Sequence, residues 1–408
     1  MEVVHARCAG LDVHQKSVVA CVRIAEGGQV RTEVRSFGTT TAALYELSDW
    51  LTASAVTAVV MEATGVYWRP VWHVLEESFA LTLANAKHVK NVPGRKTDVN
   101  DATWLAELHA HGLIRGSFVP PRAVQELREM TRARKQLVQE RARHAQRVQK
   151  VLESANVKLS TFISDVLGKS GRAMLEAMIA GESDPEALAS LAHPRLQASR
   201  AELVEALRGR VTNHHRVMLR LHLDQLDATE RAISTIEGHV EAALGSFREA
   251  RDLLVTIPGV STAAATAIVA EIGTDMTRFA TPGHLLSWAG LCPRADESAG
   301  KRRSTRIRQG APWLKPMLVQ TAWAAVRVKT GYERAHFLRL KSRRGPGRAI
   351  IAVAASILSA IWHMLRDRVA YRNLGPHHYV LHDRERLARG LVRRLNTLGY
   401  AVTLPAAA

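Results

Sequence analysis

Residues 8–37 consist of short runs of apolar and β-branched residues separated by turn residues, a pattern typical of β-strands. The pattern predicts three strands, over residues 9–13, 17–24 and 29–37. The turn Glu26-Gly27-Gly28 joins the second strand to the third, because glycine accepts the backbone angles of a tight turn. We therefore predict an antiparallel meander at the start of the chain.

Helical spacing appears after residue 40 and then alternates with short β-rich runs. The predicted elements are a helix at 41–51, a strand at 58–61, a helix at 66–79, a strand at 81–85 and a helix at 98–111. Gly112 ends the last of these helices. Three strands followed by alternating helices and strands predict a mixed α/β domain over residues 1–120.

The Pro120-Pro121 break separates this domain from a mainly helical remainder. We predict a helical region over residues 121–250, a mainly α domain over 251–372 and a basic tail over 373–408. The segment 122–150 carries nine Lys or Arg against three Glu, with apolar residues at heptad-like positions, namely Leu127, Met130, Leu137 and Val148. A basic coiled-coil arm or dimerisation helix fits this pattern, and a solvated helix face fits it as well.

Length and charge narrow the possible functions. A chain of 408 residues with 47% hydrophobic residues is long enough for two or three domains with buried cores. Its 56 Lys and Arg exceed its 38 Asp and Glu by 18, and the natural partner of such an excess is a polyanion, first of all nucleic acid. A generally arginine-rich proteome would give the same balance, so the clustering of the charge has to decide.

Cysteine spacing and the apolar runs bear on the compartment. Cys8, Cys21 and Cys292 form no CxxC pair, so neither a disulfide framework nor a zinc site is predicted. The longest apolar runs, such as residues 349–361, are shorter than a bilayer span requires. Both observations fit a protein of the reducing cytoplasm.

Two acids occupy unusual positions in the predicted sheet. Asp12 lies in the middle of the first strand, where an unpaired charge among apolar residues is costly. Glu62 lies at the end of a later strand and is followed by the turn at Gly65. If the two strands are neighbours, the two carboxylates meet.

A second pair of acids follows at the start of the predicted helix at 98–111. Asp98 and Asp101 are three residues apart, so their carboxylates project from one face of that helix. Four neighbouring acids repel one another, and a hard divalent cation with oxygen ligands, Mg²⁺ above all, relieves the repulsion. Asp98 as a helix cap, or a single acid at a strand end, is an ordinary structural feature, so the order of the four acids carries the functional interpretation.

The segments that hold these acids resemble a known family. They are Gly10-Leu11-Asp12-Val13-His14, Met61-Glu62-Ala63-Thr64-Gly65-Val66-Tyr67 and Lys96-Thr97-Asp98-Val99-Asn100-Asp101-Ala102. With the C-terminal block described next, they resemble the DEDD transposases of insertion sequences, the bridge recombinases. The resemblance implies an α/β RNase H-like (RuvC-like, Holliday-junction-resolvase type) N-terminal domain and a C-terminal transposase domain with a catalytic serine.

The C-terminal block opens with a possible helix-hairpin-helix. The turn Ile257-Pro258-Gly259 precedes an alanine-rich helix, and in such a motif the backbone amides at the turn bind a DNA phosphate. Gly259 is the candidate contact. Ser261 stands where the motif has its second glycine, and a purely structural helical hairpin remains an alternative.

A polar loop with a serine follows, and we expect it to be irregular from residue 288 to 303. It begins Gly290-Leu291-Cys292-Pro293-Arg294 and continues to Ser298, which the resemblance implies to be the nucleophile that forms a covalent phosphoserine with DNA. The candidate cations that would contact nucleic acid and stabilise the developing charge are Arg294, Lys301, Arg302 and Arg303. Ser304 is close enough in sequence that the assignment could shift to it, and most loop serines are only solvated.

The sequence thus predicts a transposase that cuts and rejoins double-stranded DNA with Mg²⁺ and a serine. The resemblance further implies an element-encoded guide RNA and a homo-oligomer, a dimer or tetramer. One alternative is a Mg²⁺-dependent junction nuclease that hydrolyses DNA without the serine. Another is a basic nucleic-acid-binding scaffold with no catalytic activity.

Overall fold

The structure is a computed structural model that describes residues 2–63, 65–85, 89, 101–293, 296–298, 300–304, 306–308, 310–379 and 384–402. For residues 296–298, 302–303 and 384–387 it describes the backbone only. The chain divides into two compact units, Met1–Val119 and Pro120–Ala408. Each unit is described by itself.

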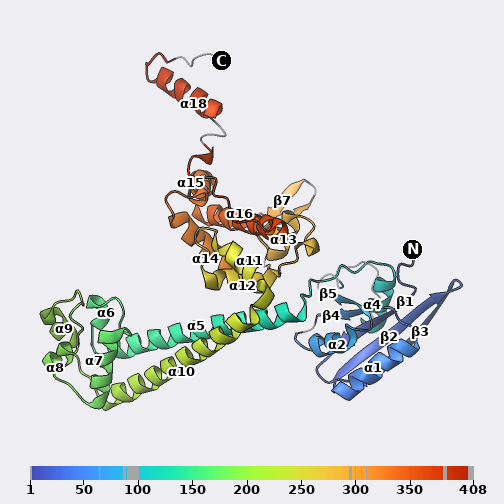
Figure 1. The fold of residues 1–408 in the computed structure, drawn as a ribbon, viewed down its shortest axis with the longest axis horizontal. Helices are drawn as coiled ribbons and strands as arrows, with labels where there is room; N and C mark the ends of the chain where they lie inside the picture. Colours follow the sequence, from blue (N-terminus) through green and yellow to red (C-terminus); the bar gives the residue numbers. More distant parts are fainter. Residues whose placement is uncertain are drawn as a thin grey trace. The chain divides into compact units, whose positions relative to one another are not determined.

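The first unit is built on a five-stranded mixed sheet with the strand order β3-β2-β1-β4-β5 (Figure 1). The three N-terminal strands form the predicted meander, and β4 and β5 add parallel to β1. The elements are β1 (Arg7–Val13), β2 (Ser17–Glu26), β3 (Gln29–Gly38), α1 (Thr41–Ala53), β4 (Ala58–Glu62), α2 (Trp68–Leu75), β5 (Ala80–Ala84) and α4 (Asp101–Ala110). This order and mixture of directions confirm the predicted RNase H-like fold.

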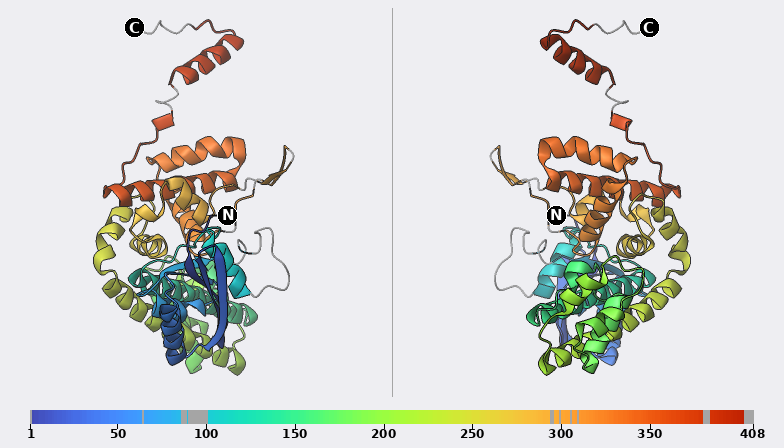
Figure 2. Two further views of the ribbon diagram at one scale, coloured as in Figure 1. Left: turned by 90° about the vertical axis from the view of Figure 1, so that its right-hand side faces the viewer. Right: turned by 90° about the vertical axis from the view of Figure 1, so that its left-hand side faces the viewer.

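Helices cover the two faces of this sheet unequally (Figure 2). On one face α1 and α2 bury Leu47 and Leu75 against apolar residues of β1 and β4, such as Leu11 and Met61. On the other face α4 lies directly on β1, because Gly10 has no side chain: a Cβ there would be 2.2 Å from the carbonyl oxygen of Ala102. This close approach fixes the start of α4 over the end of β1.

Two local predictions differ from the structure. The helix predicted over residues 66–79 is shorter, α2 at Trp68–Leu75, because a turn precedes it and Gly65 has a positive φ of 54°. Asp12 is the second-to-last residue of β1 rather than one in its middle, because the strand ends at Val13 and residues 7 and 8 extend it only at its start.

The second unit begins with two long helices, α5 (Arg122–Ser154) and α10 (Asn213–Ala243), which lie side by side (Figure 1). The apolar positions of the predicted heptads therefore have a partner within the same chain: Val148 packs in one core cluster with Leu219 and Leu223 of α10. Short helices close the far end of the pair, namely α6 (Leu159–Phe162), α7 (Lys169–Ala180), α8 (Pro185–Ser190) and α9 (Arg200–Leu207). We call α5 to α10 the arm.

A helical bundle follows the arm. It consists of α11 (Arg248–Val255), α12 (Thr262–Ile272), α13 (Pro282–Ala289), α14 (Leu314–Arg327), α15 (Tyr332–Arg344) and α16 (Pro346–Asp367), with short 3-10 turns at Gly245–Phe247 and Met276–Arg278. Arg132 of α5 binds Glu271 of α12 with two hydrogen bonds of 2.7 and 2.8 Å, and the Glu271 side chain is 6% exposed. Such a two-point, buried ion pair fixes the arm to the bundle.

Helix α16 is the one described helix that is long and apolar enough to cross a membrane by length and composition. It extends beyond the run predicted at 349–361, to 22 residues. Its buried residues, such as Val353, Ile357 and Ile361, line one side of the helix, and α16 packs on α13, α14 and α15. It is therefore the core helix of the bundle.

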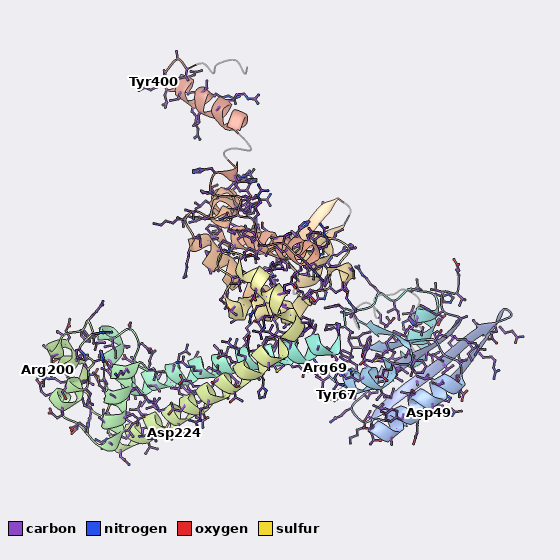
Figure 3. The ribbon with its side chains drawn as sticks, in the orientation of Figure 1. Asp49, Tyr67, Arg69, Arg200, Asp224 and Tyr400 are labelled. Carbon is purple, nitrogen blue, oxygen red and sulfur yellow. The ribbon has the colours of Figure 1, made fainter. Side chains whose placement is uncertain are left out.

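Two further elements were not predicted. The segment expected to be an irregular loop contains a two-stranded sheet of β6 (Asp296–Ser298) and β7 (Lys301–Ser304). The predicted basic tail contains a helix, α18 (Arg384–Thr397), and Tyr400 follows it (Figure 3). The last residues of the tail, 403–408, lie outside the described residues.

Candidate active site

Two of the predicted acids lie side by side at the carboxyl edge of the sheet. The strands β1 and β4 are parallel, and their last aligned pair is Leu11 with Met61. Asp12 and Glu62 come one residue later on each strand. Aligned residues of neighbouring parallel strands point to the same face, so both carboxylates emerge on the face that α4 covers.

Helix α4 brings a third acid toward the same edge. The thiol of Cys8 lies 3.5 Å from the carbonyl oxygen of Ala106, while Gly10 lies opposite Ala102, one turn earlier in the helix. Moving along β1 toward its end therefore means moving toward the start of α4. Asp12 follows Gly10 on this face, and Asp101 is the first residue of the helix.

The carboxylates already have local partners. The Nε2 atom of His14 lies 3.0 Å from Oδ2 of Asp12. We expected the Asp12 side chain to be buried in the sheet, but it is 19% exposed. Glu62 and Asp101 also take part in polar interactions. Asp98 lies outside the described residues.

The donor chemistry of this edge suits a hard divalent cation. Its acids are all carboxylates on two strands and a helix start, and oxygen ligands are what Mg²⁺ prefers. Within the described part of the chain, no three His, Cys, Asp or Glu side chains are grouped closely enough to hold a metal ion as they lie. A complete ligand set thus requires Asp98, a shift of side chains, or both.

The structure adds residues to this edge that the sequence did not single out. Asn85 directly follows β5, next to the end of β4, and a polar residue right after a strand is the signal that would have found it. Val66 and Tyr67, after Glu62, are 61% and 40% exposed, and Figure 3 labels Tyr67 at the start of α2. Cys8 lies at the other end of β1, and burial raises the pKa of its thiol to about 11, so it is not a nucleophile at neutral pH.

The predicted nucleophile lies at the tip of the β6–β7 hairpin. Ser298 is the last residue of β6 and pairs with Lys301, so a two-residue turn joins them. Asp296 pairs with Ser304 at the other end, which separates the two candidate serines by the length of the hairpin. Arg302 and Arg303 belong to β7, while Arg294 lies outside the described residues.

Two glycines hold the base of this hairpin. A Cβ on Gly290 would lie 2.4 Å from Cα of Gly310, and a Cβ on Gly310 would lie 2.3 Å from the carbonyl oxygen of Ala289. The two backbones therefore touch at the end of α13, and a bridge between Pro293 and Ile307 continues the pairing. Gly310 is a residue that the sequence analysis missed.

The turn at Gly259 packs inward on the bundle. Its φ is 85°, and a Cβ there would lie 2.4 Å from the backbone nitrogen of Ala325 in α14. Ser261 caps α12, since its hydroxyl accepts a hydrogen bond from the amide of Ala264. The close packing against α14 explains why a glycine is needed at position 259. Contact of Gly259 with DNA stays a prediction.

Comparison of the chain with known proteins shows which family it belongs to. Residues 9–157 match a model described as "Transposase", and residues 251–337 match one described as "Transposase IS116/IS110/IS902 family". The chain belongs to this family. The first match includes Asp12 and Glu62, and the second includes Ser298.

Curated relatives of the transposase agree with this assignment. It is 26% identical over 326 residues to the transposase for insertion sequence element IS1111A of Coxiella burnetii, covering 78% of this chain and 80% of that protein. It is also 26% identical over 340 residues to the 44.8 kDa protein of insertion element IS116 of Streptomyces clavuligerus, covering 73% and 81%. The transposase is therefore a DNA-cutting enzyme, and catalysis by its DEDD domain depends on a metal.

Proposed function

We propose that this transposase cuts and rejoins DNA by combining the carboxylates of its first unit with the serine of its β6–β7 hairpin. The observation that carries the proposal is the side-by-side position of Asp12 and Glu62 at the ends of β1 and β4. Two strands of one sheet hold this pair, so its spacing is set by the fold. Ser298, at the tip of a separate hairpin, supplies the nucleophile that carboxylates do not.

In this proposal Asp12, Glu62, Asp98 and Asp101 hold Mg²⁺. When bound, the metal neutralises the charge of the scissile phosphate. His14 orients the Asp12 carboxylate through its Nε2 atom. The exposed Val66 and Tyr67 beside this edge contact the DNA strand next to the cleavage point.

The serine step conserves the energy of the phosphodiester bond. The Ser298 hydroxyl loses its proton and its oxygen bonds to phosphorus, while the bond from phosphorus to one DNA oxygen breaks and that oxygen leaves with a proton. A hydroxyl of a second DNA end then attacks the phosphoserine, releases the serine and reseals the strand. Arg294, Lys301, Arg302 and Arg303 stabilise the charge that develops on the phosphate oxygens, and Gly259 contacts the backbone nearby.

The remaining parts of the proposal concern partners. An element-encoded RNA selects the DNA sites, and the active enzyme is a homo-oligomer, a dimer or tetramer. It acts in the bacterial cytoplasm, at the nucleoid. The positive net charge of 18 suits binding to both nucleic acids.

The test is cleavage of the element's junction DNA by the full chain with its flanking RNA and Mg²⁺, analysed on denaturing gels for a protein–DNA adduct. We expect an adduct with the wild type and none with Ser298→Ala. Ser304→Ala is the matched control, since it changes the same hairpin at its other end, and it should keep the adduct. Cleavage that survives Ser298→Ala without any adduct would instead make the enzyme a metal-dependent nuclease.

A further inference from the structure

The turn between α15 and α16 carries a cluster of positive charges without acidic partners among the described residues. Lys341, Arg343, Arg344 and Arg348 flank this turn and are all exposed. The sequence has no Asp or Glu from residue 334 to residue 366. Within the described residues, none of these four cations takes part in an ion pair. We call the four residues the basic hairpin.

The acids that flank this stretch are already engaged. Glu333, at the start of α15, is buried and accepts a hydrogen bond from the hydroxyl of Tyr371. Asp367, at the end of α16, binds Arg366 at 2.6 and 2.8 Å. Neither is available to neutralise the basic hairpin.

Several arginines of the arm, unlike the four cations of the basic hairpin, form ion pairs. Arg134 pairs with Glu237, Arg141 with Glu230, and Arg172 with Asp227. Several arginines of the arm are thus paired with acids on a neighbouring helix. A generally basic composition does not explain why the basic hairpin lacks such acids.

The basic hairpin is also held in place and open to a partner. Phe337 of α15 is 5% exposed and contacts the Trp323 ring at a centroid distance of 5.5 Å, while Ala349 and Ile350 of α16 are buried. Gly345, with a φ of 76°, turns the chain between the helices. A Cβ on Gly345 or Gly347 would have no atom within 4 Å, so nothing in the described bundle covers the turn.

We propose that the basic hairpin binds the phosphate backbone of double-stranded DNA and positions it on the transposase domain. Four like charges held on one turn repel one another, and the phosphates of a bound polyanion neutralise them. Binding also releases counterions from the polyanion, which favours the complex at low salt. Duplex DNA is the partner because it is what the enzyme cuts. Contacts to phosphates fix the position of the duplex and do not read its sequence.

The test measures the salt dependence of DNA binding by the full chain. The variant replaces the four cations by glutamine (Lys341→Gln, Arg343→Gln, Arg344→Gln, Arg348→Gln), and binding to a duplex of random sequence is followed by fluorescence anisotropy. We expect the slope of log K against log salt to fall by roughly 0.9 for each lost phosphate contact, and the affinity to fall about tenfold or more. Circular dichroism checks that the variant is folded.

A matched control removes the same charge from the arm, with Arg195, Arg200, Arg208 and Arg210 changed to glutamine. These residues lie at the end of the arm formed by the short helices, where Figure 3 labels Arg200. These arginines are exposed, and their removal should leave the slope near the wild-type value. Lysine at positions 343, 344 and 348 should restore most of the slope, because it keeps the charge.

Three results would overturn the proposal: a wild-type slope in the glutamine variant, an equal loss in the control, or a loss confined to binding of the flanking RNA. The last would assign the basic hairpin to RNA. The assay contains no cleavage step, and Ser298→Ala should bind with the wild-type slope. Failure here is therefore distinct from failure of the serine mechanism.

Discussion

The sheet edge that carries Asp12 and Glu62 is supported by many more packed strands and helices than the β6–β7 hairpin that carries Ser298. Asp12 and Glu62 end two neighbouring strands of a five-stranded sheet, and helices cover both faces of that sheet. Ser298 ends a three-residue strand that pairs with one four-residue strand and with nothing else described. Two-stranded sheets are only marginally stable by themselves.

The difference suggests a division of labour. The sheet sets the spacing of the carboxylates before any ligand binds, as catalytic groups on rigid elements require. The base of the hairpin is fixed by the close approach of Gly290 and Gly310, whereas a Cβ on Gly300, near its tip, would meet no atom within 4 Å. The two regions belong to different compact units, so a joint mechanism needs both units to meet the same DNA.

The largest expected effect tests whether the two regions act on one reaction. Asp12→Asn and Ser298→Ala should each lower the rate of strand transfer by on the order of 10³, since each removes a group needed in the same transition state. The double variant should be no slower than the slower single variant. Rates come from single-turnover assays on junction DNA.

Asp49→Asn is the control for loss of an acid in the first unit, because Asp49 is exposed on α1 (Figure 3). It should react at the wild-type rate. Fully additive losses in the double variant would mean that the carboxylates and the serine serve separate reactions.

A second, smaller effect compares how rigidly the two regions are built. Gly10→Ala should destabilise the first unit by about 3 kcal/mol or more, because its Cβ would meet backbone atoms of Ala102 and Ala106 at 2.2 and 2.5 Å. Gly300→Ala, at the tip of the hairpin, meets no atom within 4 Å and should cost only about 1 to 2 kcal/mol for its φ of 72°. Denaturant unfolding of both variants measures the difference.

Equal destabilisation by the two alanine variants would show that the hairpin is as tightly packed as the sheet. It would remove the structural reason for the proposed division of labour.

The smallest expected effect is a loss of stability of the first unit at acidic pH, caused by the buried His109 of α4. Burial, with a further contribution from the nearby His5, lowers the pKa of His109 from its ordinary value of 6.5 to about 4, and the residue is 5% exposed. Between pH 4 and pH 6.5 the His109 imidazole is neutral in the folded state but protonated in the unfolded state. The free energy of unfolding is therefore unaffected by His109 above pH 6.5 and falls as the pH drops toward 4. Between pH 7 and pH 5 the first unit should lose about 2 kcal/mol from this residue.

His109→Phe keeps a ring that can stack on His5, which lies 4.5 Å away, but does not titrate. It should remove that part of the pH dependence, measured as hydrogen exchange of peptides covering β1 and α4. An unchanged pH dependence would rule out His109 as its source.

The fold class was predictable because its signals are local. The succession of strand and helix patterns predicted a mixed α/β domain, and the resemblance of the acid-bearing segments implied the RNase H-like order that the structure has. The hairpin around Ser298 was missed, since strands of three and four residues are too short to show a period. Helix α18 was taken for a tail because it is dominated by arginine and has no long apolar run.

The candidate site was predictable only in part. The sequence singled out Asp12 and Glu62 by their positions, and the parallel pairing of β1 with β4 explains why they meet. Asn85 carried a signal, a polar residue directly after a strand, that was not used, whereas nothing local marked Gly310, which matters because it packs against Gly290, a residue distant in the chain. The role of each acid and of Ser298 stays a prediction until the variants are measured.

By itself, the sequence determined the order of the elements, the excess of positive charge and the acids that close two strands. These follow from the period and type of neighbouring residues. Only the tertiary structure decided that Gly10 lets α4 lie on the sheet, that Gly259 packs against α14, and that several arginines of the arm have acidic partners while the described residues provide none for the basic hairpin. The physical reason is that close contact and charge compensation depend on distances between segments far apart in the chain, which no local pattern contains.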